Sequence, residues 1–221
     1  MLPDDEIAHR WNEVRRRLDA SSGDVVLVAV TKTFPSDAWA AVVRAGGGDV
    51  GENYAQELMT KSRDYAERFP DLPRPRVHFI GRLQSNKVRG LANVVDLWQT
   101  VDRTSLIVEI ARWAPGAHVL LQVNATGEPD KGGCPPEQVG ALVAEARGMG
   151  LVVDGLMVVG PTDGDPDRTR QAFADVGRLA DHEGLAVRSM GMSADLEIAV
   201  DEGSTMVRVG SALFGDRPPV G

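Results

Sequence analysis

Short apolar runs alternate with longer amphipathic segments along the chain. The first run, at residues 25–30, reads Val-Val-Leu-Val-Ala-Val and contains no polar position. Such uninterrupted β-branched runs are typical of parallel strands that are buried on both faces. Seven further strands are predicted, near Val50 and over residues 77–80, 94–98, 118–123, 155–159, 187–190 and 206–209.

Helical patterns fill the intervals between the predicted strands. In one of them, Pro136 begins a segment whose apolar residues recur at helical spacing, and Gly148 ends it. One more helix is predicted before the first strand. Its apolar stripe follows the helical period and consists of Ile7, Trp11, Val14 and Leu18.

A strict alternation of strands and helices implies a parallel sheet. Eight such units in a chain of 221 residues fit a compact barrel better than an open sheet, which more often has five or six strands. We therefore predict an α/β fold, a single (β/α)₈ TIM barrel with an extra N-terminal helix, with residues 1–221 as one domain. The open doubly wound sheet is the structural alternative.

Composition and charge narrow the classes of partner. The formal net charge is −8, and no block of lysines and arginines offsets it, which argues against nucleic acid or an anionic membrane as partner. The acidic start lacks the pattern of a signal peptide, and no apolar run is long enough to span a membrane. The single cysteine, Cys134, excludes an intrachain disulfide, and we expect no metal site. The expected location is the cytoplasm.

The chemistry of such barrels lies at the carboxyl ends of the strands. The first predicted strand leads into Thr31-Lys32-Thr33. Lys32 has two readings: a strand-end lysine that extends its amine to solvent, or a partly desolvated amine that acts as a nucleophile toward a carbonyl. Asn53 follows the second strand, as a helix cap or as a ligand-binding residue.

The last two units suggest an anion site. Ser193 follows the seventh strand and Gly210-Ser211 follow the eighth, each before a predicted helix. Glycines, a hydroxyl and N–H groups at helix starts can hold a phosphate, although Ser193 can equally be a simple helix cap. Arg208 lies within an apolar strand, so it needs either a structural carboxylate or an acceptor on a ligand.

Six segments in one order also resemble a known family, the pyridoxal phosphate homeostasis proteins. The resemblance implies a barrel of the alanine racemase N-terminal type and the cofactor pyridoxal 5′-phosphate (PLP). The segments that carry it cover nearly the whole chain and are Ala29–Thr33, Gly51–Tyr54, His78–Lys87, Gly155–Met157, Gly191–Asp195 and Gly203–Gly210.

The resemblance assigns roles to particular residues of this chain. Lys32 matches the lysine that forms a Schiff base with PLP. Ser193, with the backbone of Gly210 and Ser211, matches the phosphate site. Arg208 matches the arginine that faces the pyridine nitrogen. These roles agree with the positions that the strand ends indicate.

A further match and some departures concern the rest of the site. Asn53 matches a residue that lines the cofactor ring. Phe34 stands where some members carry a second lysine. A relay of cofactor between lysines would therefore depend on Lys131 or Lys87, and Lys131 can equally be a solvated loop residue. The role of His78 stays open.

Arg208 also bears on whether the protein is an enzyme. A cation beside the pyridine nitrogen opposes its protonation and weakens the ring as an electron sink. Alanine racemases share that arginine and add a tyrosine base supplied through a C-terminal β-domain, and we expect no such domain here. Tyr54 is the nearest tyrosine to the barrel mouth.

Two functions follow from these expectations. The first is a PLP carrier in vitamin B6 homeostasis, without turnover, monomeric, with PLP-requiring apo-enzymes as candidate recipients. The alternative is a small fold-type-III amino-acid racemase that uses PLP. A barrel that binds another phosphorylated metabolite without an imine is a third reading, and it predicts no visible absorbance.

Overall fold

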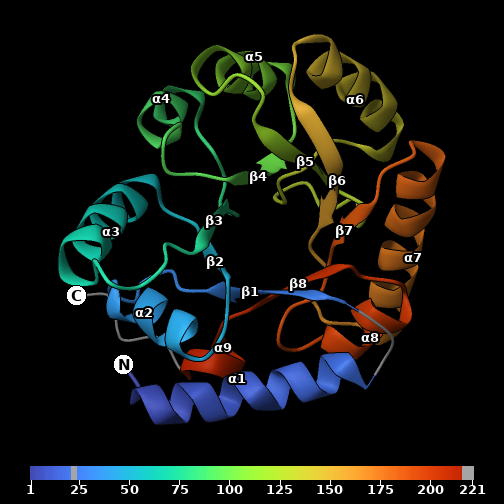
Figure 1. The fold of residues 1–221 in the computed structure, drawn as a ribbon. Helices are drawn as coiled ribbons and strands as arrows, with labels where there is room; N and C mark the ends of the chain where they lie inside the picture. The colour runs from blue at the N-terminus through green and yellow to red at the C-terminus, as the bar shows by residue number, and fades with distance from the viewer. Residues whose placement is uncertain (21–23, 216–221) are drawn as a thin grey trace.

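The computed structural model describes residues 1–20 and 24–215. Eight parallel strands form a closed barrel in which each strand pairs with its neighbours in chain order and β8 pairs with β1 (Figure 1). The predicted (β/α)₈ barrel is confirmed, and the open sheet is excluded. The strands are β1 (Val26–Val30), β2 (Asp49–Glu52), β3 (Arg76–Phe79), β4 (Leu97–Val101), β5 (His118–Val123), β6 (Val152–Val158), β7 (Val187–Ser189) and β8 (Met206–Val209).

Helices surround the barrel and bury the outer faces of the strands (Figure 1). The extra N-terminal helix is confirmed as α1 (Asp4–Asp19), which packs against α2 (Asp37–Arg44) and α9 (Ser211–Phe214) through the predicted apolar stripe. None of the described helices is long and apolar enough to cross a membrane. The remaining helices are α3 (Ala55–Arg68), η1 (Ser85–Lys87), α4 (Val88–Leu91), α5 (Thr104–Trp113), η2 (Pro136–Gln138), α6 (Val139–Gly148), α7 (Pro166–His182) and α8 (Leu196–Asp201).

The strand run 25–30 contributes to two apolar clusters, because alternate side chains of a strand point to opposite faces. Leu27 and Ala29 belong to the large cluster between strands and helices. Val28 belongs to a separate, smaller cluster inside the barrel. Burial on both faces explains why the run contains no polar residue. The interior cluster consists of Val28, Leu97, Leu120, Met157 and Met206.

The predicted position of the fourth strand is wrong. The apolar pattern places it at 94–98, whereas β4 spans Leu97–Val101 and Val94 lies in a turn. The pattern fails because Gln99 and Thr100 are polar yet buried, at 0% and 4% exposure. Both side chains have hydrogen-bond partners inside the fold, so their burial is tolerated.

Candidate functional site

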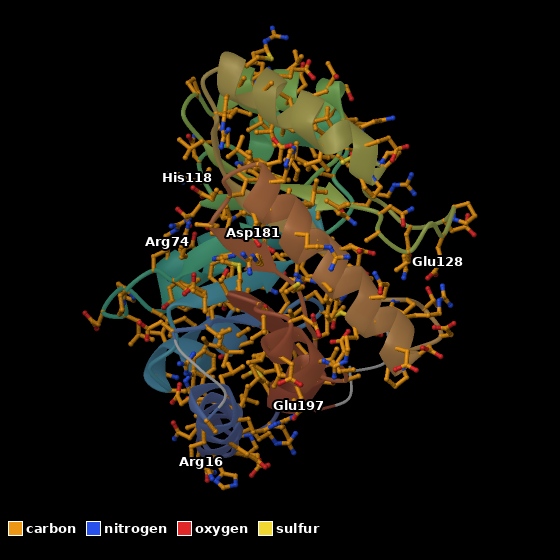
Figure 2. All side chains as sticks on the ribbon, turned by 90° about the vertical axis from the view of Figure 1, so that its right-hand side faces the viewer. Arg16, Arg74, His118, Glu128, Asp181 and Glu197 are labelled. Carbon is orange, nitrogen blue, oxygen red and sulfur yellow. The ribbon has the colours of Figure 1, made fainter. Side chains whose placement is uncertain are left out.

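A cavity of about 490 Å³ opens where β1 and β8 end, at the carboxyl end of the barrel. Figure 2 shows the barrel from the side, with His118 near the amino ends of the strands and Glu128 on a loop at the opposite, carboxyl end. The cavity contains one amine, one guanidinium and two hydroxyls. Its lining consists of Val30, Lys32, Phe34, Met192, Ser193, Ala194, Arg208, Gly210, Ser211 and Gly215.

Lys32 lies two residues after β1 and is half-buried in the cavity wall. The next residue, Thr33, has φ of +69°, a left-handed conformation that is unfavourable for a β-branched side chain. The Thr33 N–H donates to Glu57 Oε1 over 2.7 Å, which helps to hold this conformation. The backbone that carries Lys32 is therefore strained and fixed from outside the barrel.

A buried ion-pair cluster supports this segment from behind. Lys61 of α3 is 4% exposed, and its Nζ donates to Glu52 Oε1 (2.6 Å), Glu57 Oε1 (2.8 Å) and the Thr31 carbonyl (2.7 Å). Glu52 Oε1 also accepts from Thr31 Oγ1 and Trp39 Nε1. Burial raises the pKa of the Glu52 carboxyl, and the Lys61 cation opposes this rise. Lys61 is not predictable from the sequence, because a helical lysine gives no signal of burial.

Arg208 is buried among backbone carbonyls at the inner wall of the cavity. Its guanidinium donates to Ser189 O (2.7 Å), Ser189 Oγ (2.6 Å) and Val158 O (2.8 Å). No carboxylate of the described residues forms a salt bridge with it, so the first of the two alternatives, a structural carboxylate, is not found in that part of the chain. Burial lowers the pKa of Arg208 to about 10, and Asp195 opposes this shift. The group is therefore a cation at neutral pH.

The predicted anion site is assembled on one side of the cavity. Ser193 lies in the turn before α8, and its Oγ accepts a hydrogen bond from Ala212 N over 3.4 Å. It is not the cap of α8, because that position belongs to Asp195. Gly210 is the N-cap of α9 and Ser211 is its first residue, where the first N–H groups have no partner within the helix. A hydroxyl and N–H groups thus converge from two turns far apart in sequence.

Asn53 is the one predicted residue that is not among the described residues lining the cavity. It follows β2, and its side-chain Oδ1 is buried without a hydrogen-bond partner in the described structure. Its backbone approaches Gly81 so closely that a Cβ at Gly81 would lie 2.0 Å from the Asn53 carbonyl oxygen. The segment is fixed, and the N-cap position of α3 belongs to Tyr54, so Asn53 is not the cap of that helix.

The other lysines named from sequence lie outside the cavity lining. Lys131, on the loop after β5, donates to Glu128 Oε1 (3.0 Å) and to the Gly160 carbonyl, so it is not a simple solvated lysine. Lys87 is exposed at the end of η1. Among the described residues, no cluster of His, Cys, Asp and Glu side chains could hold a metal ion.

The fold and the cavity define a class of protein: a (β/α)₈ barrel with a lysine after the first strand and an anion site after the last two. The family model of the alanine racemase N-terminal domain matches residues 4–218. The pyridoxal phosphate homeostasis protein of Pseudomonas aeruginosa is 38% identical over 219 residues, 96% of this chain and 93% of that protein. That of Deinococcus radiodurans is 39% identical over 206 residues, covering 91% and 94%. The chain belongs to the pyridoxal phosphate homeostasis protein family, as its sequence segments predict.

Solved structures agree with this assignment. PipY of Synechococcus elongatus, in a structure with PLP bound, is 31% identical with a TM-score of 0.83, over 95% of this chain and 100% of that chain. Alanine racemase from Corynebacterium glutamicum is 18% identical with a TM-score of 0.73 over 98% of this chain and 62% of that chain. The racemase likeness shows the fold alone.

Proposed function

We propose that this protein binds PLP as a Schiff base on Lys32 and carries the cofactor in vitamin B6 homeostasis without catalytic turnover. The observation that carries the proposal is the cavity itself, which brings Lys32, Ser193, Arg208, Gly210 and Ser211 together from both ends of the sequence. PLP carries an aldehyde, a phosphate and a pyridine ring, and these residues offer one partner for each. The names of the relatives and the PLP-bound PipY structure support the same ligand.

Each residue has a role that follows from its chemistry. The Lys32 amine condenses with the aldehyde. The Ser193 hydroxyl and the N–H groups of Gly210 and Ser211 hold the phosphate. Arg208 faces the pyridine nitrogen and, as a cation, disfavours protonation there. Asn53 is assigned to the edge of the cofactor ring. The residue is not part of the cavity lining, and the unpartnered Oδ1 of its side chain supports the assignment.

The proposal of a carrier without turnover rests on the small number of general bases in the cavity. When bound, PLP supplies a ring that can accept electrons, but racemisation also needs a proton removed on one face and returned on the other. Lys32 is the only described cavity residue whose side chain is a general base. Tyr54 does not line the cavity and is 53% exposed, and Tyr65 donates its hydroxyl to the Pro73 carbonyl. A racemase is the second candidate, favoured only by the shared fold.

Reduction with borohydride tests the attachment. The protein with PLP should absorb visible light, and reduction should fix the adduct on the peptide that contains Lys32. Lys32→Ala should lose the band and keep the fold, while Lys87→Ala, at an exposed lysine, should keep both. A label on another peptide, or no visible band at all, would refute the Schiff base and favour a different phosphorylated ligand.

Activity and assembly have their own tests. Incubation with L-alanine should give at most trace D-alanine, and turnover near the usual enzyme scale of about 10 s⁻¹ would overturn the carrier reading. Transfer of cofactor to a PLP-requiring apo-enzyme, followed by recovery of that enzyme's activity, would support delivery. A single domain over 1–221, a monomeric state and a cytoplasmic location stay predictions.

A further inference from the structure

A chain of hydrogen bonds runs from the cofactor side of the barrel to its opposite end. Arg208 of β8 donates to Ser189 Oγ of β7 (2.6 Å), and Ser189 Oγ donates to Gln99 Oε1 of β4 (2.7 Å). Gln99 Nε2 lies 2.6 Å from His78 Nδ1 of β3, and His78 Nε2 lies 2.8 Å from Asp49 Oδ1, at the start of β2. We call these five side chains the interior chain.

The donor and the acceptor in each hydrogen bond of the interior chain can be assigned from the Arg208 end. A guanidinium can only donate, so Ser189 Oγ accepts from it. The single hydroxyl proton of Ser189 is then free to point toward Gln99 Oε1. Because the amide oxygen of Gln99 is used in this way, its amide nitrogen faces His78 and donates to Nδ1.

The Asp49 end gives the same direction independently. A carboxylate accepts, so His78 donates from Nε2, and a neutral imidazole then accepts at Nδ1. Burial lowers the pKa of His78; Asp49 and Asp96 oppose this shift, whereas Arg76 adds to it. Both ends therefore require one orientation of Gln99, and the whole chain has a single polarity.

The burial of the interior chain beside apolar residues determines how firmly Arg208 is held. The interior chain lies beside the apolar interior cluster, and four of its five members are at most 4% exposed. A fully partnered polar network in such a place fixes side-chain positions, whereas a broken one leaves buried groups unsatisfied. Arg208 is held through Ser189 and the Val158 carbonyl and has no carboxylate partner among the described residues. Its position therefore depends on how Ser189 is oriented.

We propose that Ser189, Gln99 and His78 are positioning residues for the cofactor site. Anchored at Asp49, they orient the Ser189 hydroxyl so that it accepts from Arg208 and fixes the guanidinium against the cofactor ring. This inference rests on the proposed function, in which Arg208 faces the pyridine nitrogen. None of the three positioning residues lines the described cavity, so they act through Arg208 alone.

A first test needs no cofactor. Nitrogen-15 NMR of the apo-protein should show distinct, slowly exchanging Nη signals for Arg208, assigned by their loss in Arg208→Met. Gln99→Met should merge or broaden them, although Gln99 does not touch Arg208. His78 should carry its proton on Nε2 at neutral pH. A proton on Nδ1, or unchanged Nη signals in Gln99→Met, would overturn the inference.

A second test uses PLP and matched variants. Gln99→Met and Ser189→Ala should weaken PLP affinity roughly tenfold and shift the pH midpoint of the visible band. Gln99→Glu should recover part of the affinity, because a carboxylate also accepts from Ser189 and, once His78 is doubly protonated, from His78 Nδ1. Thr100→Val is the control. Thr100 lies next to Gln99 on β4, and its side chain donates a buried hydrogen bond to the Gly81 carbonyl, outside the interior chain. This substitution should change PLP affinity by less than about twofold.

The outcomes separate the inference from the proposed function. If the wild type binds PLP on Lys32 and both Gln99→Met and Ser189→Ala behave as Thr100→Val does, the positioning roles fail and the proposed function stands. If the wild type binds no PLP, both fail, whatever the NMR signals show. Should Gln99→Met not fold, Ser189→Ala and the rescue by Gln99→Glu decide the matter.

Discussion

Replacing Lys61 by methionine gives the sharpest prediction about the scaffold beneath Lys32. The substitution keeps an unbranched side chain one atom shorter and removes the charge and three hydrogen bonds, to Thr31 O, Glu52 Oε1 and Glu57 Oε1. Glu52, which is fully buried, then lacks its counter-ion. Breaking a buried pair in this way costs about 3–5 kcal/mol of the free energy of unfolding.

The loss should depend on pH in a defined direction. The pKa of Glu52 is already raised above 4.5 by burial, and removing Lys61 raises it further. A carboxyl whose pKa is raised in the folded state stabilises the fold while it is protonated. That contribution is fully present below the pKa of the unfolded state and is lost as pH rises through the pKa of the folded state. Lys61→Met should therefore be more destabilising at pH 8 than at pH 5.

Urea unfolding at both pH values measures this effect. Lys87→Met removes an exposed lysine and should change stability by less than about 0.5 kcal/mol. In the double variant Lys61→Met, Glu52→Gln, much of the loss should be recovered, because no buried charge is left unpaired. A loss below about 1 kcal/mol for Lys61→Met at pH 8 would refute the role of Lys61 as the counter-ion.

Three further predictions concern the site and the barrel interior. Pyridoxal, which lacks the phosphate, should bind orders of magnitude more weakly than PLP in equilibrium dialysis. Ser193→Ala should lower the affinity for PLP and leave the affinity for pyridoxal unchanged. Equal affinities of the wild type for PLP and pyridoxal would refute the phosphate site. Arg208→Glu, if folded and loaded, should favour a protonated pyridine and increase slow transamination, seen as a changed absorbance spectrum; an unchanged spectrum would place Arg208 away from the ring. The lowered pKa of His78 means that the unfolded chain takes up the proton first, so stability should fall below pH 6.5 by up to about 1.4 kcal/mol per pH unit. His78→Asn should flatten that slope, whereas the exposed His182→Asn should keep it.

The sequence alone was enough to predict the barrel, because each strand and helix buries a face whose apolar period is local. The run 25–30 and the stripe from Ile7 to Leu18 appear in the structure as β1 and α1. The places of Lys32, Ser193 and Arg208 at strand ends and within a strand made them candidates, the family resemblance assigned them to the cofactor site, and the structure places all three on one cavity. Position in the alternating pattern made these residues candidates, and the family resemblance was needed to choose between the two readings of each.

Tertiary structure decided the polar interior. Gln99 interrupts an apolar pattern and shifted the predicted strand, yet it is fully buried, because its partners His78 and Ser189 come from β3 and β7. Lys61 looks like any helical lysine until the fold brings Glu52 and the Thr31 carbonyl to it.

The physical reason for this division is the range of each interaction. Burial of apolar surface follows a repeat of two or three to four residues, so a short window of sequence reveals it. A buried polar group is tolerated only when distant residues satisfy its hydrogen bonds, as those of Arg208 are satisfied from β6 and β7. Closure of the barrel decides which distant residues come into contact, and no local sequence pattern contains that information.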